Sequence, residues 1–346
     1  MTRARRWQPL GWAVAALVLV SACGTSNAQP PPSPTAVAQY VAPGPRTAEI
    51  ADHDITPIAE NPQPEMPVTV DSFDGVEVEI SNVSRIVTVD MYGTLTETVF
   101  SLGLGDNVVG RDGSSDFPAA ADVPIVTTGG HDLSAEAILD LDPTVVLTDT
   151  TIGPREVQQK LRQSGVPVVY FDPDRTLDGI PDLIMDVATT LGIPGAGEAL
   201  VERTQGELDE ALAMSEHVDD PPRIAFLYLR GAAGVYLMGG PGSGADDLIR
   251  AVGGIDVGTE IGLETPFTPM TSEALITASP DVILVMSNGL ESVGGVDKML
   301  EMPGIAQTPA AADRRIIDMA DTELLTFGAR SGQTVQALAR ALYDQQ

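Results

Sequence analysis

One histidine of this chain stands where it could bind a ligand. His131 lies in "TTGGHDLSAEAIL" (residues 127–139), directly after Gly129 and Gly130 and at the end of the strand-like stretch "IVTT". A neutral imidazole ligates metals through a ring nitrogen, and two residues without side chains let the backbone approach a flat ligand closely. Because ligands of open α/β sheets bind beyond the carboxyl ends of strands, we expect a metal-ligating histidine here; the alternative is an ordinary loop histidine.

A second candidate lies in "RIAFLYLRG" (residues 223–231), which has the pattern of a buried strand. Alternate side chains of a strand share a face, so Tyr228 and Arg230 should lie together at its C-terminal end. A phenolate is a hard oxygen donor suited to ferric iron, and tyrosine is a known axial haem ligand. A guanidinium beside it would favour the ionised phenol. The alternative is a solvated strand-end tyrosine beside a surface arginine.

The elements that would position these residues alternate between strand-like and helix-like stretches from residue 84 onward, which is typical of parallel α/β architecture. Within them, "SAEAILDLDPTVVL" (134–147) aligns without gaps on "TSEALITASPDVIL" (271–284). A repeat of helix, proline turn and strand predicts two lobes of one fold. Thr268 occupies the position equivalent to His131 in the second copy, so the fold itself does not require a histidine there.

A long helix is predicted between the two lobes. Leu200, Thr204, Leu208 and Leu212 recur every fourth residue and mark one helix face. A helix over residues 195–216 would be about 33 Å long, enough to bridge two lobes. We therefore expect an N-terminal lobe over 66–178, a connecting helical segment over 179–218 and a C-terminal lobe over 219–346. "VTVDSFDGVEVEI" at the start of the first lobe predicts a hairpin.

The N-terminus predicts export and anchoring. Residues 1–22 combine three arginines with the apolar run "LGWAVAALVLV", as a signal peptide does. The "VSAC" that follows resembles the bacterial lipobox, which implies a lipid on Cys23, the only cysteine, at the outer face of the cell membrane. An ordinary signal peptide is the alternative. Residues 23–65, rich in Pro, Ser, Thr and Ala, predict a disordered tether with a solvated His53.

The composition argues against two classes of function. The net charge is −30, with 49 acidic residues against 19 basic ones, and such a surface repels phosphate backbones, so we expect no nucleic-acid binding. No Ser-His-Asp arrangement, HExxH motif or cysteine cluster can be assigned, so we expect no enzyme.

Together, the repeat, the long helix and the lipobox resemble the iron-compound and cobalamin class of substrate-binding lipoproteins of ABC importers, over residues 84–346. This resemblance implies two Rossmann-like α/β lobes joined by a single long helix (the class III periplasmic-binding-protein fold), a monomer, and a permease with its ATPase as partners. It also implies that Glu136 and Glu273, at equivalent places in the repeat, dock onto permease arginines. From the residues alone, both could simply be acids that favour a helix N-terminus.

The Gly-Gly-His and Tyr-x-Arg motifs resemble the haemin-binding branch of this class, the HmuT-like proteins. This implies that haem, as the transported ligand, is clamped between the lobes by axial His131 and Tyr228, with Arg230 supporting the tyrosinate. Gly129, Gly130, Tyr92 and Met238 are further candidates for the cleft lining. A ferric siderophore or cobalamin carried to the same type of importer is the alternative.

Overall fold

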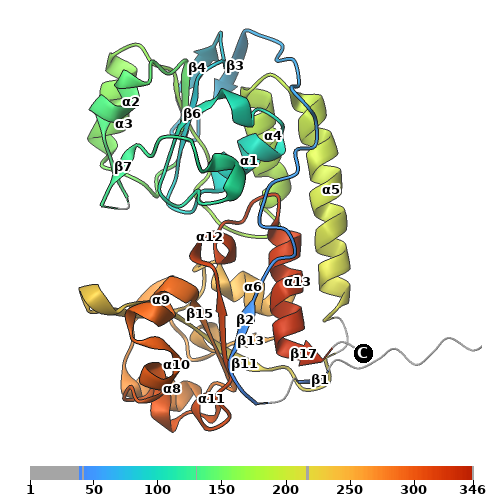
Figure 1. Cartoon of the computed structure of the whole chain (residues 1–346), viewed down its shortest axis with the longest axis vertical. Coiled ribbons are helices and arrows are strands. Elements are labelled where there is room, and N and C mark those ends of the chain that lie inside the picture. The colour runs from blue at the N-terminus through green and yellow to red at the C-terminus, as the bar shows by residue number, and fades with distance from the viewer. Residues whose placement is uncertain (1–38, 41–42, 130, 216–217, 345–346) are drawn as a thin grey trace, which may run out of the picture. The chain divides into compact units, whose positions relative to one another are not determined.

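The computed structural model of the protein describes residues 39–40, 43–129, 131–215 and 218–344. It has the predicted α/β architecture, with two lobes linked by one long helix (Figure 1). Cys23 and Gly130 lie outside the described residues.

The N-terminal lobe is built on a four-stranded parallel sheet in the order β10-β9-β5-β6. The strands are β5 (Ile86–Val89), β6 (Val108–Arg111), β9 (Val145–Thr148) and β10 (Val168–Tyr170). Their residues are buried almost throughout, as expected for a parallel sheet covered by helices on both faces. The helices are α1 (Thr94–Ser101), α2 (Ala135–Asp140), α3 (Arg155–Gln163) and α4 (Ile180–Thr190). The predicted hairpin is present as β3 (Val68–Asp71) and β4 (Glu77–Ile80).

The C-terminal lobe is built on a mixed sheet in the order β14-β12-β11-β15-β16-β2, with β13 also paired to β11. The strands are β11 (Arg223–Arg230), β12 (Val235–Gly239), β13 (Ile255–Asp256), β14 (Phe267–Pro269), β15 (Val282–Met286), β16 (Ile316–Met319) and β2 (Arg46–Ala48). The helices are α6 (Ala245–Ala251), α7 (Val257–Glu260), α8 (Ser272–Ala278), α9 (Ser287–Ser292), α10 (Gly295–Leu300), α11 (Pro309–Ala312), α12 (Asp321–Leu324) and α13 (Ser331–Leu342).

The sequence repeat is a structural repeat. Each copy is a short helix followed by a buried parallel strand, α2 and β9 in the first lobe and α8 and β15 in the second. Ser134 Oγ accepts a hydrogen bond from the Ala137 N–H at 3.2 Å, and Thr271 Oγ1 accepts one from the Ala274 N–H at 3.1 Å. These caps leave Glu136 and Glu273 exposed in the first turns of their helices.

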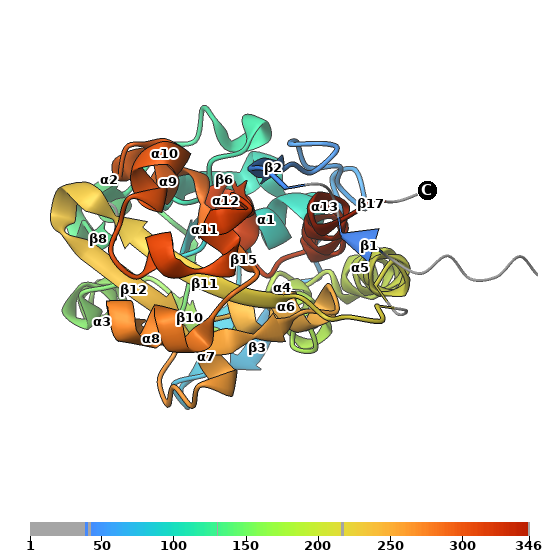
Figure 2. The ribbon, with the colours of Figure 1, turned by 90° about the horizontal axis from the view of Figure 1, so that it is seen from below.

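The predicted connecting helix is α5 (Pro194–Ala213). Leu200, Thr204 and Leu208 are buried along one face, whereas Leu212, at the C-terminal end, is 38% exposed. The helix contacts α4 of the first lobe and α13 of the second, and Figure 2 shows α13 beside it. None of the helices in the described ranges combines the length and the apolar character needed to cross a membrane.

The prediction of a disordered tether over 23–65 is wrong for its C-terminal part. Residues 46–48 form β2, which pairs in parallel with β16 at the edge of the C-terminal sheet. The chain then passes to the N-terminal lobe, where Ile55 is buried and the Ile58 N–H donates to the Ser101 carbonyl at 2.7 Å. An open sheet edge presents unpaired backbone groups, and β2 satisfies them despite its proline-rich surroundings. His53 lies in this segment and its Nδ1 is 2.8 Å from Glu323 Oε1, although its side chain is 60% exposed.

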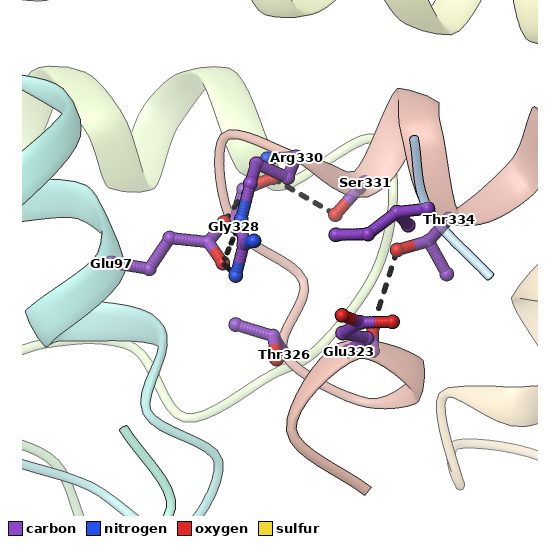
Figure 3. Close-up of a pocket in the computed structure, with 8 residues that line it drawn as sticks. Glu97, Glu323, Thr326, Gly328, Arg330, Ser331 and Thr334 are labelled. Carbon is purple, nitrogen blue, oxygen red and sulfur yellow. Dashed lines mark hydrogen bonds and ion pairs between the residues drawn. The ribbon is translucent and has the colours of Figure 1, made fainter. Parts of the chain in front are cut away.

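A buried ion pair joins the two lobes. Glu97 on α1 accepts hydrogen bonds from the Nε and Nη2 of Arg330, which precedes α13, at 3.0 and 2.9 Å (Figure 3). Its other oxygen accepts from the Arg330 N–H at 3.0 Å. Thr94, also on α1, donates to the carbonyl of Thr326. Several hydrogen bonds therefore connect α1 to the segment before α13.

Candidate ligand-binding cleft

A cavity of about 570 Å³ is lined by residues of both lobes. Most of the lining residues follow the C-terminal ends of the parallel strands β5, β6, β11, β15 and β16, where binding sites of α/β sheets are expected. The lining residues are Met91, Tyr92, Gly113, Ser114 and His131 from the N-terminal lobe, and Tyr228, Arg230, Leu237, Phe267, Met286, Asn288, Asp321, Thr322 and Leu325 from the C-terminal lobe.

His131 reaches this cavity from the tip of a small hairpin. The hairpin consists of β7 (Thr127–Thr128) and β8 (Asp132–Leu133), paired antiparallel. The predicted strand "IVTT" therefore ends in a hairpin rather than in the parallel sheet, but His131 still lies just beyond it, with an exposed side chain. Gly129 has a φ of 58°, a left-handed conformation that favours glycine, and it is not among the lining residues. Glycine here thus serves the turn.

Tyr228 and Arg230 share one face of β11, as predicted. Both are half-buried, while Leu229 between them is buried on the opposite face. The Arg230 guanidinium carbon lies 4.5 Å from the centroid of the Tyr228 ring, within the range of a cation–π contact. The Tyr228 ring also packs edge-to-face against Phe267, with 5.8 Å between the ring centroids. The tyrosine therefore contacts both an aromatic ring and a cation.

Two hydrogen-bond acceptors hold the guanidinium of Arg230. Its Nη1 donates to the Leu229 carbonyl at 2.9 Å, and its Nη2 donates to Asp321 Oδ2 at 2.8 Å. Asp321 Oδ1 accepts from the Asn288 N–H at 2.9 Å. A Cβ atom on Gly289 would lie 2.9 Å from the Leu229 carbonyl oxygen and 3.3 Å from Arg230 Nη1, so glycine leaves room for this carbonyl and its hydrogen bond to Arg230. Asp321 was not found from the sequence, because its contact with Arg230 joins segments 91 positions apart.

Tyr92 also lines the cavity, as predicted, but its surroundings differ from those of Tyr228. Near it lie two buried aspartates, Asp90 and Asp149, and the cation Arg175, while a third buried aspartate, Asp112, accepts a hydrogen bond from the Asp90 N–H. Burial raises the pKa of Tyr92, and Asp149 and Asp90 raise it further, while Arg175 lowers it in part. This environment favours the neutral phenol.

The buried aspartates hold the backbone next to the lining residues and do not line the cavity themselves. Asp90 accepts hydrogen bonds from the N–H groups of Tyr92, Thr94 and Leu95, at the start of α1. Burial raises the pKa of Asp112 to about 7 and that of Asp149 to about 6, and the charge of Asp90 adds to both increases. Within the described residues, no group of three or more His, Cys, Asp or Glu side chains is arranged to hold a metal ion. We interpret the aspartates as structural.

The prediction of Met238 as a lining residue is wrong. Its side chain is 1% exposed and packs in the core of the C-terminal lobe. Side chains alternate along β12, so the neighbouring Leu237 faces the cavity and Met238 the opposite side.

The cavity carries little net charge. Among its described lining residues, Arg230 is the one permanently charged cation, and Asp321 is its ion-pair partner. The walls otherwise consist of apolar side chains and neutral polar groups.

Comparison with known proteins shows the family to which the chain belongs. Residues 89–322, more than half of the chain, match the model of the family described as periplasmic binding protein. A crystal structure of a haem-binding protein named HmuT is 43% identical, with a TM-score of 0.84, covering 88% of this chain and 98% of that one. The periplasmic haem-binding protein RhuT from Roseiflexus sp. RS-1, without ligand, is 40% identical, with a TM-score of 0.70, covering 76% and 99%.

Three further HmuT structures carry alanine in place of one histidine, one tyrosine and one arginine, and that tyrosine and arginine lie two positions apart. Among curated proteins, a cobalamin-binding protein of Halobacterium salinarum is 26% identical over 259 residues. The match covers 72% of this chain but only 64% of that protein, so this chain spans less than two thirds of its length.

Proposed function

Because the chain belongs to the periplasmic binding protein family, we propose that it captures haem, as ferric protoporphyrin, outside the cytoplasm and delivers it to an ABC importer. One observation carries the proposal: an imidazole from the N-terminal lobe and an arginine-backed tyrosine from the C-terminal lobe line the same cavity. A planar iron porphyrin has two open axial positions, one on each face. His131 and Tyr228 would supply one ligand to each.

The chemistry of the two side chains fits ferric iron. A phenolate is a hard anionic donor, and the charge of Arg230 beside it stabilises the ionised form. Tyr92 is the competing phenol, but burial and the aspartates behind it raise its pKa. We therefore assign axial ligation to Tyr228 and His131, and lining of the cleft to Tyr92.

The polarity of the cavity favours haem over a ferric siderophore. Leu237, Phe267, Met286 and Leu325 offer apolar surface to a porphyrin ring. A siderophore complex is typically a bulky anion that needs several cationic side chains, and the one permanent cation described in this cavity is paired with Asp321. The haem-binding proteins HmuT and RhuT, at 43% and 40% identity, add support, and the histidine, tyrosine and arginine substituted in HmuT correspond in type to His131, Tyr228 and Arg230.

Delivery requires an anchor and a docking surface. We propose that Cys23 carries the lipid that holds the protein at the outer face of the cell membrane. Glu136 and Glu273, exposed in equivalent helices of the two lobes, would dock the monomer onto cationic residues of a permease that its ATPase drives.

The test is an absorbance titration of residues 24–346 with haemin, for the wild type, His131→Ala and Tyr228→Ala. The wild type should give a saturable Soret shift with tyrosinate-to-iron charge-transfer bands, and each substitution should change the spectrum. His53→Ala removes a histidine outside the cavity and should leave the spectrum unchanged. A wild type without a saturable shift would overturn the proposal, and titrations with a ferric siderophore and with cobalamin would then decide between the alternatives.

A further inference from the structure

We propose that Asp321 is a positioning residue for haem binding, which holds the guanidinium of Arg230 against Tyr228. The inference rests on the proposed function, because it concerns the support of a tyrosinate ligand. Asp321 would act through Arg230 and not by touching the iron.

The first step is that Arg230 needs to be held. Its side chain is 33% exposed and lies at the last position of β11, where the strand's own hydrogen bonding ends. A long arginine side chain loses considerable rotamer freedom when it is fixed in one conformation. Apart from the Leu229 carbonyl, Asp321 is the described hydrogen-bond acceptor that fixes it over the Tyr228 ring.

The second step is that Asp321 is itself fixed. It is the first residue of α12, directly after β16, and its side chain is 15% exposed. Its Oδ1 accepts the Asn288 N–H, which lies in α9 just after the end of β15, while its Oδ2 accepts from Arg230 at the end of β11. One carboxylate thus connects the ends of three neighbouring parallel strands. Because both oxygens are engaged, the direction in which it holds Arg230 is defined.

The third step is that the proposal predicts the direction in which removal of Asp321 changes tyrosinate ligation. A negative charge near Tyr228 opposes formation of a phenolate, so if Asp321 acted only as a nearby charge, its removal would strengthen tyrosinate ligation. If Asp321 acts by holding Arg230, its removal lets the guanidinium leave the ring and weakens ligation. The two roles therefore predict opposite changes.

The experiment compares the haemin complexes of the wild type, Asp321→Ala, Arg230→Ala and the double variant. One readout is the rate of haem transfer to excess apomyoglobin. The other is the pH at which the tyrosinate charge-transfer band is lost on acidification. We expect Asp321→Ala to release haem about fivefold faster, in keeping with a partly exposed ion pair, and to lose the band at higher pH. The double variant should release haem no faster than Arg230→Ala, since without the guanidinium Asp321 has nothing left to position.

Controls separate positioning from folding. Asp321→Asn keeps the side-chain volume and one acceptor oxygen, and should give an intermediate effect if Asp321→Ala is too unstable to study. Asp297→Ala removes a carboxylate from an exposed ion pair with Arg314 and should leave both readouts unchanged. The inference is overturned if Asp321→Ala binds haem as tightly as the wild type or more tightly, or if the effects of Asp321→Ala and Arg230→Ala add. A wild type that shows no tyrosinate band would instead refute the proposed function.

Discussion

Arg330 in the C-terminal lobe donates three hydrogen bonds to the carboxylate of Glu97 in the N-terminal lobe, two from its guanidinium and one from its backbone N–H. Both side chains are nearly buried, with 10% and 3% exposed. A further guanidinium nitrogen, Nη1, donates to the His53 carbonyl at 3.1 Å, so the same arginine also secures the N-terminal segment. This buried ion pair therefore connects the two lobes and the N-terminal segment.

Breaking that pair should destabilise the whole protein. Glu97→Gln leaves the guanidinium buried without its counter-charge, and removing one partner of a buried pair typically costs about 3 kcal/mol or more. Urea denaturation would measure the loss in the free energy of unfolding. Glu301→Gln, in an exposed pair with Lys298, is the matched control and should change the free energy by less than about 1 kcal/mol. Equal effects of the two substitutions would contradict the prediction.

The two tyrosines of the cleft should respond differently to loss of their hydroxyl groups. Tyr228→Phe should abolish the tyrosinate-to-iron bands of the haemin complex, because the phenylalanine ring has no donor atom. Tyr92→Phe should keep these bands, since burial and the neighbouring aspartates favour the neutral phenol at that position. Absorbance and resonance Raman spectra would distinguish the two. Loss of the bands in Tyr92→Phe alone would show that the axial ligand has been assigned to the wrong tyrosine.

The stability of the haem-free protein should fall between pH 5 and pH 8, in part because of Asp112. Burial, with the charge of Asp90, raises the pKa of this carboxyl from its ordinary value of 3.8 to about 7. In this window the folded chain therefore binds more protons than the unfolded chain, and the free energy of unfolding decreases as pH rises. Asp112→Asn removes this contribution.

From pH 5 to pH 8, the free energy of unfolding of Asp112→Asn should decrease by about 2 kcal/mol less than that of the wild type. Urea denaturation at the two pH values would measure this difference. The lost acceptor for the Asp90 N–H is the same at both pH values and cancels in the comparison. Asp297→Asn, at an exposed carboxyl, should follow the wild type. Parallel pH dependences for Asp112→Asn and the wild type would refute the prediction.

Replacing Glu136 and Glu273 together should reduce haem transport without changing haem binding. Glu136→Ala combined with Glu273→Ala should reduce haem uptake through the reconstituted importer by about tenfold or more, because two charge pairs with the permease would be lost. The haemin titration should stay unchanged. The substitutions lie in exposed first turns, so we expect little effect on folding. Replacing Glu156, which is exposed in the first turn of α3, is a matched control that should keep transport intact. Full transport by the double variant would refute docking through these residues.

Lipid anchoring should depend on Cys23 alone, because the chain has no other cysteine. Cys23→Ser should move the protein from the membrane fraction to the soluble extracytoplasmic fraction. Retention of Cys23→Ser in the membrane fraction would mean that the segment before it remains uncleaved.

Much of the architecture could be predicted because its signals are local and periodic. The capped repeat around Ser134 and Thr271, the connecting helix and the shared face of Tyr228 and Arg230 each follow from spacing within one element. The hairpin that carries His131 was not predicted, because its two-residue strands give no periodic signal.

The features that were missed depend on contacts between distant segments. Asp321 meets Arg230 across 91 positions, and the three buried aspartates belong to the ends of three different strands. Met238 was misplaced because a strand's spacing shows which residues share a face but not which face meets the cleft. Strand β2 was hidden by the prolines around it, since its partner β16 lies about 270 positions away.

Strand β2, together with β1 (Gln39–Tyr40) before it, would also limit how far the protein can travel from a lipid on Cys23. With a disordered segment up to residue 66, the leash from Cys23 would extend to about 150 Å when fully stretched. Since Gln39 and Tyr40 already pair with β17 (Tyr343–Asp344), only 16 positions remain before the first paired residue, or about 55 Å. The volume that a molecule can sweep scales with the cube of this reach, so it is about twentyfold smaller. A permease within that radius would meet its receptor correspondingly more often, and one beyond it could be served only by lateral diffusion of the anchor.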